Sequence, residues 1–244
     1  MQYLGGKFRL RKVIAGFVND AIREKGSAFY VEPFVGGNNI SALVNPTCDG
    51  WIPGVRKYLF DANLALINLY RAIQYGWVPP DEMSADQYAV LKRANDATNP
   101  LTAFAAVGCS FGGKWWGGYA TNQPHNGIDY ARAAKRRLTE KLATGSLFAC
   151  VPFLTVDPHP SAVFYLDPPY DSTTGYAGCP PFDNRTFWVH AAYLVRKGAT
   201  VLVSEYRPPP VPHTLLHVQA KNIESCLLKH RGQDTAEKLF RLLP

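Results

Sequence analysis

The sequence predicts an α/β fold built around a mostly parallel sheet, interrupted by one small insertion. Two apolar runs, residues 29–34 and 57–61, each precede a turn and a segment of helical character. Successive strand–turn–helix units of this kind are typical of parallel sheets. The pattern lapses after residue 76 and resumes at about residue 147. We therefore expect one domain formed by residues 1–76 and 142–244, with residues 77–141 as the insertion.

The first helical segment is expected from residue 40 to about residue 44. Further helices are expected over residues 64–73, 130–142 and 184–196. Further strands are expected over residues 147–151, 163–166 and 200–204. Two short runs near the end, 214–218 and 238–242, are expected to form an antiparallel pair.

Composition narrows the class of protein. The chain has 244 residues, and its 26 Lys and Arg against 19 Asp and Glu give a net charge of +7, which is compatible with a polyanionic partner. Its five cysteines are widely spaced and contain no Cys-x-x-Cys pair, so neither a zinc site nor a disulfide framework is expected. We see no signal peptide and no apolar run long enough to span a membrane, and we expect a cytoplasmic protein.

A chemically distinctive turn, Asp167-Pro168-Pro169-Tyr170, follows the strand expected over residues 163–166. Two prolines fix the backbone and remove two amide donors, which leaves a carboxylate, bare carbonyls and an aromatic ring. The Asp167 carboxylate and the Pro168 carbonyl can accept the two hydrogens of a planar exocyclic amine, whose lone pair then points at an electrophilic methyl group. Tyr170 can stack on the base. The alternative is a simple turn in which Asp167 caps a helix.

A second motif, Glu32-Pro33-Phe34-Val35-Gly36-Gly37, follows the first strand. A glycine-rich turn there lets a ligand approach the backbone closely. Asp61 ends the second strand, where an acid can bind both hydroxyls of a ribose. The pair of features indicates a nucleoside cofactor. The alternatives are an ordinary tight turn at Gly36 and a helix cap at Asp61.

Together these motifs resemble those of the Dam-like family of DNA adenine methyltransferases. Tyr3-Leu4-Gly5-Gly6-Lys7 resembles its N-terminal motif, residues 32–37 its cofactor motif and residues 167–170 its catalytic motif, in the family's order. The resemblance implies a Rossmann-like methyltransferase sheet with a reversed final strand, and transfer of a methyl group from S-adenosyl-L-methionine to the 6-amino group of a flipped-out adenine. It assigns catalysis to Asp167, Pro168, Pro169 and Tyr170, and cofactor binding to Tyr3, Gly5, Gly6, Lys7, Glu32, Pro33, Phe34, Gly36, Gly37, Asn38, Asp61 and Asp167.

The resemblance also makes the insertion a mainly helical target-recognition region for double-stranded DNA. Residues 109–119 loosely resemble the loop that enters DNA, and Trp115, Trp116 or Tyr119 is expected to fill the space of the flipped base by stacking. The expected DNA contacts are Lys7, Lys114, Trp115, Trp116, Tyr119, Arg132, Lys135, Arg136 and Arg137. Alternatively, the aromatic residues form the core of the insertion and the basic ones a solvated helix face.

The sequence departs from the family at two places. Asn38 stands where a further glycine is usual; because Asn tolerates a left-handed backbone, we expect the turn to survive with weaker cofactor binding. Residues 114–116 are Lys-Trp-Trp where relatives often carry Arg and Asn, so no recognition sequence can be transferred.

Other activities remain open at this point. The same turn would serve cytosine in DNA, although cytosine enzymes more often carry Ser first, or adenine in RNA. A catalytically silent DNA-binding relative is a further alternative. A nicotinamide-dependent oxidoreductase is disfavoured because the glycine pattern differs and no hydride-transfer acid and base are evident. The short chain favours an enzyme without a restriction partner, as in phages and mobile elements.

Overall fold

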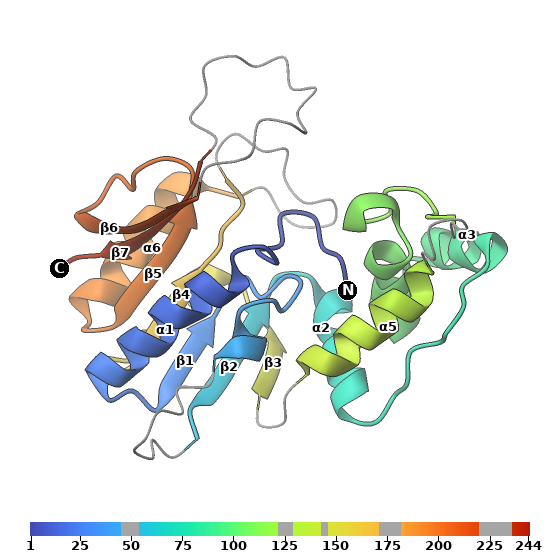
Figure 1. The fold of residues 1–244 in the computed structure, drawn as a ribbon, viewed down its shortest axis with the longest axis horizontal. Coiled ribbons are helices and arrows are strands. Elements are labelled where there is room, and N and C mark those ends of the chain that lie inside the picture. The colour runs from blue at the N-terminus through green and yellow to red at the C-terminus, as the bar shows by residue number, and fades with distance from the viewer. Residues whose placement is uncertain (45–53, 122–128, 143–145, 171–181, 220–235) are drawn as a thin grey trace, which may run out of the picture.

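A seven-stranded sheet forms the centre of the protein (Figure 1). The computed structural model describes residues 1–44, 54–121, 129–142, 146–170, 182–219 and 236–244. The strands are β1 (Phe29–Glu32), β2 (Arg56–Asp61), β3 (Ser146–Cys150), β4 (Val163–Leu166), β5 (Thr200–Glu205), β6 (His213–Gln219) and β7 (Glu237–Leu242). Their order across the sheet is β3-β2-β1-β4-β5-β7-β6.

The strand directions confirm the Rossmann-like, mostly parallel sheet with a reversed final strand. β1 pairs in parallel with β2 and β4, and the pairs β2–β3 and β4–β5 are also parallel. Only β7 is reversed among the described strands, because it runs antiparallel to both β5 and β6. The strand order changes direction between β1 and β4, and open α/β sheets bind ligands beyond the carboxyl ends of the strands at such a point.

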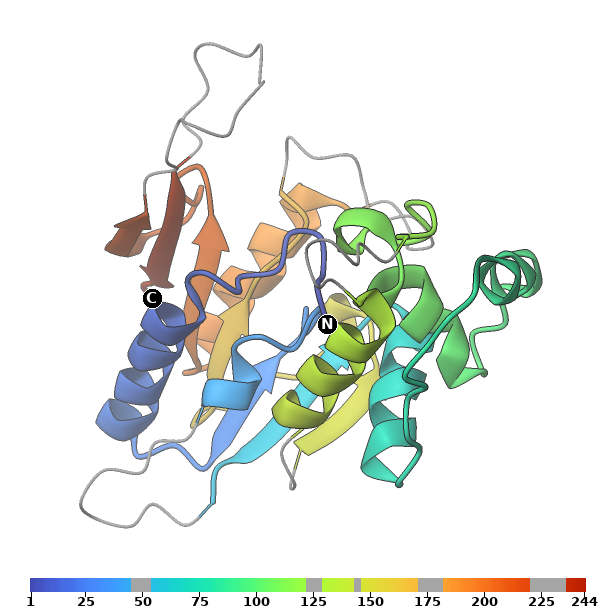
Figure 2. The same cartoon turned by 45° about the vertical axis from the view of Figure 1, so that its right-hand side comes forward.

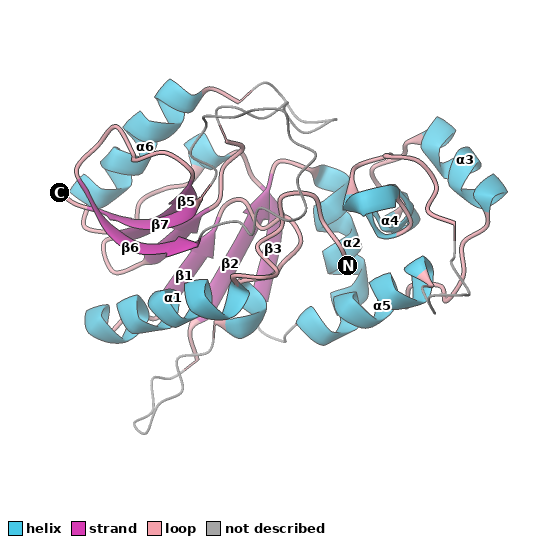
Figure 3. Ribbon diagram, turned by 45° about the horizontal axis from the view of Figure 1, so that its top comes forward, coloured by secondary structure: helices cyan, strands magenta, loops and turns pink. Residues whose placement is uncertain are grey.

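Side chains of β4 alternate between the two faces of the sheet, as the pleat requires. Val163 and Tyr165 join one apolar cluster, which includes Ile14 and Val18 of α1 (Arg11–Lys25). Phe164 and Leu166 join the other cluster, which is covered by α6 (Asn184–Arg196). Helices therefore shield both faces of β4, and Figure 3 shows α1 and α6 on opposite sides of the sheet.

The remaining helices are α2 (Leu64–Gln74), α3 (Ala85–Ala94), α4 (Pro100–Ala103) and α5 (Tyr130–Lys141). The helices expected over 64–73, 130–142 and 184–196 are confirmed to within one residue. Two longer helices, α1 and α3, were not expected. The helix expected from residue 40 is only a 3-10 turn, Ser41–Leu43, and β1 ends at Glu32 rather than at residue 34. No described helix has the length and apolar character needed to cross a bilayer.

The inserted residues share the core of the sheet domain. Between α2 and β3 the chain forms α3, α4, a π-helical turn over Phe104–Gly108, a 3-10 turn over Phe111–Gly113 and α5. Phe104 is fully buried and belongs to the same cluster as Leu66 and Tyr70 of α2 and Tyr165 of the sheet. The described helices of this region therefore do not enclose a separate apolar core, and its exact boundaries stay a prediction.

Because the core is continuous, Phe104→Ala should destabilise the whole protein. We expect the free energy of unfolding in urea to fall by about 3–5 kcal/mol in a single transition. Val90→Ala on α3 is the control, because Val90 is 54% exposed and its truncation should cost less than about 0.5 kcal/mol. A separate early transition in the Phe104 variant would instead show that the insertion unfolds independently.

Candidate active site

The N-terminal segment and the ends of several strands meet at the carboxyl edge of the parallel strands. Figure 2 shows the N-terminal segment crossing this edge toward the insertion. Tyr30 pairs with Val163 and Val31 with Phe164, so Glu32 and Asp167 leave their strands at the same edge. β7 is reversed and thus begins where the parallel strands end, which brings Glu237 to this edge as well.

An ion pair lies at the centre of the site. The Lys7 ammonium is 2.7 Å from Asp167 Oδ1 and 3.6 Å from Glu237 Oε1. It also donates to the Gly5 carbonyl at 3.1 Å. The Lys7 side chain is only 6% exposed, against 17% for Asp167 and 15% for Glu237. One buried cation is thus shared by two partly buried carboxylates.

Tyr170 completes this cluster. Its hydroxyl hydrogen-bonds to Glu237 Oε1 and lies 3.3 Å from Asp167 Oδ1. The Lys7 ammonium sits 4.8 Å from the centre of its ring, at cation–π distance. The Tyr206 ring packs edge-on at 4.5 Å. The turn therefore holds the aromatic ring beside the carboxylate, with Pro168 buried and Pro169 half-buried between them.

Burial shifts the pKa values of the acids at this edge. Burial and, to a smaller extent, Glu237 raise the pKa of Asp167 to about 6, although Lys7 acts to lower it. Burial likewise raises the pKa of Glu205 to about 7. Asp167 is therefore mostly ionised at neutral pH, yet basic enough to accept a proton.

The glycine loop after β1 has the backbone that the sequence predicts. Gly36 has φ 44° and Asn38 φ 50°, so Asn38 adopts the left-handed conformation. A Cβ at Gly37 would lie 2.8 Å from the Tyr3 Cβ, and one at Gly36 3.2 Å from the Tyr3 ring. Likewise, a Cβ at Gly6 would lie 2.8 Å from the Asn39 amide nitrogen. The absent side chains allow the N-terminal motif to pack directly on the loop.

Asp61 supports this loop from the end of β2. Its two carboxylate oxygens accept the backbone N–H groups of Gly36 at 3.0 Å and Asn63 at 2.9 Å. The cap of α2 is Asn63, which accepts from Leu66, so the helix-cap alternative for Asp61 is wrong. A carboxylate offers about four lone-pair sites, so Asp61 keeps acceptor capacity for a ribose hydroxyl beside its backbone donors, which include Ala62. Asp61 is half-buried, which fits a ligand group at its exposed side.

Glu32 is a buried acid at the end of β1. It is 2% exposed and accepts a hydrogen bond from the Tyr30 hydroxyl at 2.8 Å. Burial, with a smaller contribution from Asp167, raises its pKa to about 8. A cationic ligand beside Glu32 would favour the ionised form of this acid. Glu32 therefore fits the sulfonium or ammonium group of S-adenosylmethionine.

The other residues of the cofactor motif contribute less chemistry. The Phe34 ring points into the apolar core below α6, 5.2 Å from Phe153, so only its backbone lies in the loop. Pro33 is buried in the same turn, and Gly5 has φ 77° in the N-terminal motif.

Two contributors escaped the sequence analysis. Glu237 belongs to no motif and is distant in sequence from Asp167. Lys141, the last residue of α5, donates to the Gly37 carbonyl at 3.0 Å and to Asn39 Oδ1 at 2.5 Å. Asn38 in turn donates to the Lys141 carbonyl at 3.3 Å. Burial lowers the pKa of Lys141 to about 8. The insertion is thus bonded directly to the glycine loop.

The aromatic residues of the loop over residues 109–119 are placed differently from one another. Trp115, Trp116 and Tyr119 are half-buried against the core, and Trp116 donates to Asn95 while Tyr119 donates to the Met83 carbonyl. Phe111 is 69% exposed. The loop lies beside the N-terminal motif, because Leu4 donates to the Gly113 carbonyl at 3.0 Å. These contacts favour a core role for the three half-buried rings.

Of the basic residues expected to contact DNA, Lys7 is buried in the charged cluster, whereas those of the insertion lie at its surface. Lys114 is exposed. On α5, Lys135 pairs with Asp81 at 3.0 Å, whereas Arg132 and Arg136 have acidic neighbours at 3.9 Å. Arg137 is half-buried. Exposed pairs of this kind are weak and can exchange for phosphate, so the assignment stays a prediction.

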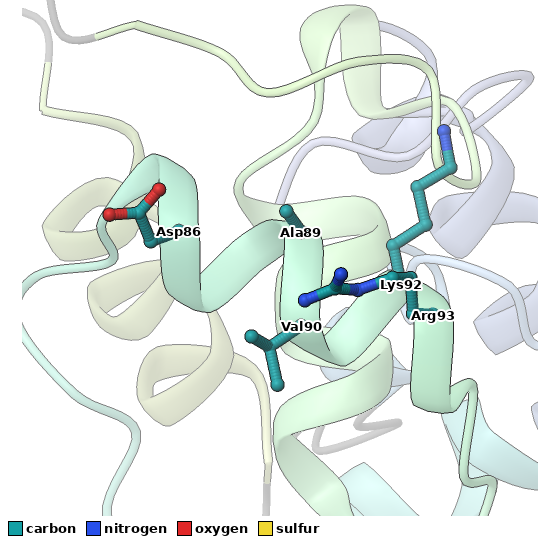
Figure 4. A pocket seen from close by; sticks show the side chains of 5 residues that line it. All are labelled: Asp86, Ala89, Val90, Lys92 and Arg93. Atoms are coloured by element: carbon teal, nitrogen blue, oxygen red, sulfur yellow. The ribbon is translucent and has the colours of Figure 1, made fainter.

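A shallow hollow on α3 lies apart from this chemistry. It is lined by Asp86, Ala89, Val90, Lys92 and Arg93, all of one helix (Figure 4). None of these residues belongs to the cluster at the sheet edge, and we place the site by the convergence of charged groups instead. The described residues contain no group of three or more His, Cys, Asp or Glu side chains arranged to hold a metal ion.

Because Glu32 is buried with a raised pKa, we expect the stability of the protein to depend on pH. Its native pKa of about 8 exceeds its ordinary value of 4.5, so the folded state binds the extra proton between these values and wild-type stability falls as pH rises. Glu32→Gln removes this dependence. The free energy of unfolding of the variant, measured in urea and compared with that of the wild type, should rise by up to about 1.4 kcal/mol per pH unit between pH 5 and 8. A constant difference across that range would refute the buried titration.

Comparison with known proteins adds two distant structures. No protein-family model matches the chain, and no curated protein matches its sequence. The solved structure of yhhF from Escherichia coli, assigned as a methyltransferase, is 10% identical, with 96% of this chain and 85% of that chain covered and a TM-score of 0.39. The rRNA methyltransferase aviRa from Streptomyces viridochromogenes is 12% identical, with coverages of 93% and 84% and a TM-score of 0.34. Likeness this distant carries no argument about activity, and the Dam-like family remains a prediction from the motifs.

Proposed function

We propose that this protein is a methyltransferase that moves a methyl group from S-adenosylmethionine to the exocyclic 6-amino group of adenine in DNA. The observation that carries the proposal is the cluster at the end of β4. There the Asp167 carboxylate and the Tyr170 ring lie together beside Lys7, at the point where the strand order changes direction. A rigid acceptor next to an aromatic face suits a planar amine.

The chemistry follows from what these groups accept and donate. S-adenosylmethionine supplies the electrophilic methyl group. The Asp167 carboxylate and the Pro168 carbonyl accept the two amine hydrogens, which frees the nitrogen lone pair for attack, and the Tyr170 ring holds the base in plane. Methylation makes the amine proton acidic, and Asp167, with its pKa near 6, is suited to receive it.

The cofactor would bind along the same edge. Asp61 would offer its remaining acceptor capacity to the ribose hydroxyls. Asp167, and Glu32 once the cationic cofactor favours its ionised form, would supply negative charge near the sulfonium. The glycine loop over residues 36–39 would position the cofactor, with Lys141 holding two of its oxygen atoms.

DNA would have to present the adenine outside the helix, because a stacked base cannot reach the turn. Phe111 is the aromatic residue of the insertion loop with the most exposed side chain for filling the vacated space. Leu4, whose amide donates to the Gly113 carbonyl of the same loop, is 49% exposed and would widen this apolar surface.

The first experiment measures transfer of labelled methyl from S-adenosylmethionine to unmethylated DNA, with product nucleosides identified. We expect methyladenine from the wild type and at least about a 100-fold slower reaction from Asp167→Ala. The control is Asp20→Asn on α1, a solvent-exposed acid that should leave the rate unchanged.

Each other product points to a different function. Methyladenine in RNA alone would move the substrate to RNA, and methylcytosine would move the target base. Cofactor binding in calorimetry without transfer to any nucleic acid would indicate a catalytically silent relative.

A second prediction concerns the insertion loop. Phe111→Ala should weaken DNA binding by roughly 1–3 kcal/mol, the usual contribution of one stacked aromatic ring, and leave the unfolding free energy unchanged. Trp116→Ala should instead mainly lower stability, because its ring packs 5.2 Å from Tyr88. Fluorescence anisotropy with a DNA duplex and urea unfolding separate the two effects. Unaltered DNA affinity in the Phe111 variant would exclude the stacking role.

A further inference from the structure

The Lys7 ammonium contacts both groups that the proposed substrate would have to reach, the Asp167 carboxylate and the Tyr170 ring. Lys7 Nζ is 2.7 Å from the Asp167 oxygen that would accept an amine hydrogen. The same nitrogen lies 4.8 Å from the centre of the Tyr170 ring on which the base would stack. An adenine amine cannot approach Asp167 and Tyr170 in this arrangement unless the Lys7 ammonium moves.

Lys7 cannot simply move away as an unpaired charge. Its side chain is 6% exposed, and a buried ammonium without a partner is strongly unfavourable. A second carboxylate is already close, because Glu237 Oε1 lies 3.6 Å from the same nitrogen. The same nitrogen also donates to the Gly5 carbonyl at 3.1 Å. A small shift of the ammonium from one carboxylate to the other keeps its charge paired throughout.

We infer that Glu237 is a positioning residue that receives the Lys7 ammonium when the substrate amine takes its place on Asp167. The inference rests on the proposed function and deepens it. The exchange involves hydrogen bonds and an ion pair only, with no change in covalent bonding.

The exchange would have two consequences for the reaction. It uncovers the face of the Tyr170 ring at the moment when the base arrives. It also removes the cation that lowers the pKa of Asp167, so the carboxylate becomes more basic when it has to accept the amine proton. Glu237 holds the Tyr170 hydroxyl as well, so the ring can remain in place while Lys7 moves.

A purely structural role for Glu237 makes a different prediction. If its carboxylate only anchored the Tyr170 hydroxyl, its loss would affect the reaction whether or not Lys7 were present. If it receives Lys7, its loss should matter only while Lys7 is there to be displaced. A double-mutant cycle measures this difference directly.

The test compares Glu237→Gln, Lys7→Met and the double variant in the methyl-transfer assay with unmethylated plasmid DNA. In the wild-type background, Glu237→Gln should raise the KM for DNA about 10-fold with kcat changed less than about threefold, because only substrate entry is hindered. In the Lys7→Met background the same substitution should change KM by less than about twofold. Equal effects in both backgrounds, or no effect on KM in either, would overturn the inference.

Glu205→Gln is the matched control. Glu205 is a neighbouring buried acid, 7% exposed, whose carboxylate accepts from the Tyr206 amide at 2.7 Å. Removing its charge should change KM at least threefold less than Glu237→Gln, which is roughly 0.7 kcal/mol of discrimination. An equal effect would mean that the total negative charge matters and not the position of Glu237, and would also overturn the inference.

A binding measurement separates failure of this inference from failure of the proposed function. Protein with 15N-labelled lysine is titrated with adenosine monophosphate, and the side-chain ammonium signal of Lys7 is followed by NMR. Movement of that signal in the wild type supports displacement even if no DNA is methylated. DNA methylation with an unmoved Lys7 signal refutes displacement alone, whereas neither methylation nor movement refutes both proposals.

Discussion

The register between β1 and β4 is the constraint on which the site depends. Because these neighbouring parallel strands end at one edge of the sheet, their pairing brings Glu32 and the glycine loop close to Asp167, which is distant in sequence. Asp61 reaches the same edge from β2, next to β1. A shift of β4 by one residue would turn Asp167 to the other face of the sheet. The apolar packing of Phe164 and Leu166 under α6 prevents that shift, so core packing fixes the position of the Asp167 carboxylate.

Sequence reasoning succeeded where chemistry and strand ends coincide. The turn over residues 167–170 follows a short, wholly apolar strand, and Asn38 has the left-handed backbone that its place in the glycine loop required. It failed for α1, whose buried face is Ile14, Ala15, Val18, Ala21 and Ile22. These residues recur at helical spacing, but small alanines and intervening charged residues weaken the apolar pattern.

Glu237 shows a different kind of limit. It precedes the run expected over 238–242 and has no motif of its own, so its residue type says nothing about its role. Topology alone could have located it. A strand that runs against its neighbours begins at the edge where they end, so the first residue of a reversed final strand falls beside the turn over residues 167–170. That deduction requires knowing that β7 lies within the sheet, next to β5. The spacing of apolar residues in a single sequence does not reveal this position.

If the insertion reads the target, as proposed, its shared core limits how that target can change. Recognition regions that form separate modules can be exchanged between relatives at their boundaries. Here Phe104 packs in one cluster with Leu66, Tyr70 and Tyr165, and Lys141 is bonded to the glycine loop. A transplanted insertion would have to match the host's α2 and its cofactor loop at the same time. New specificity is therefore more accessible through substitutions in surface loops such as the one that carries Phe111 than through replacement of the whole segment.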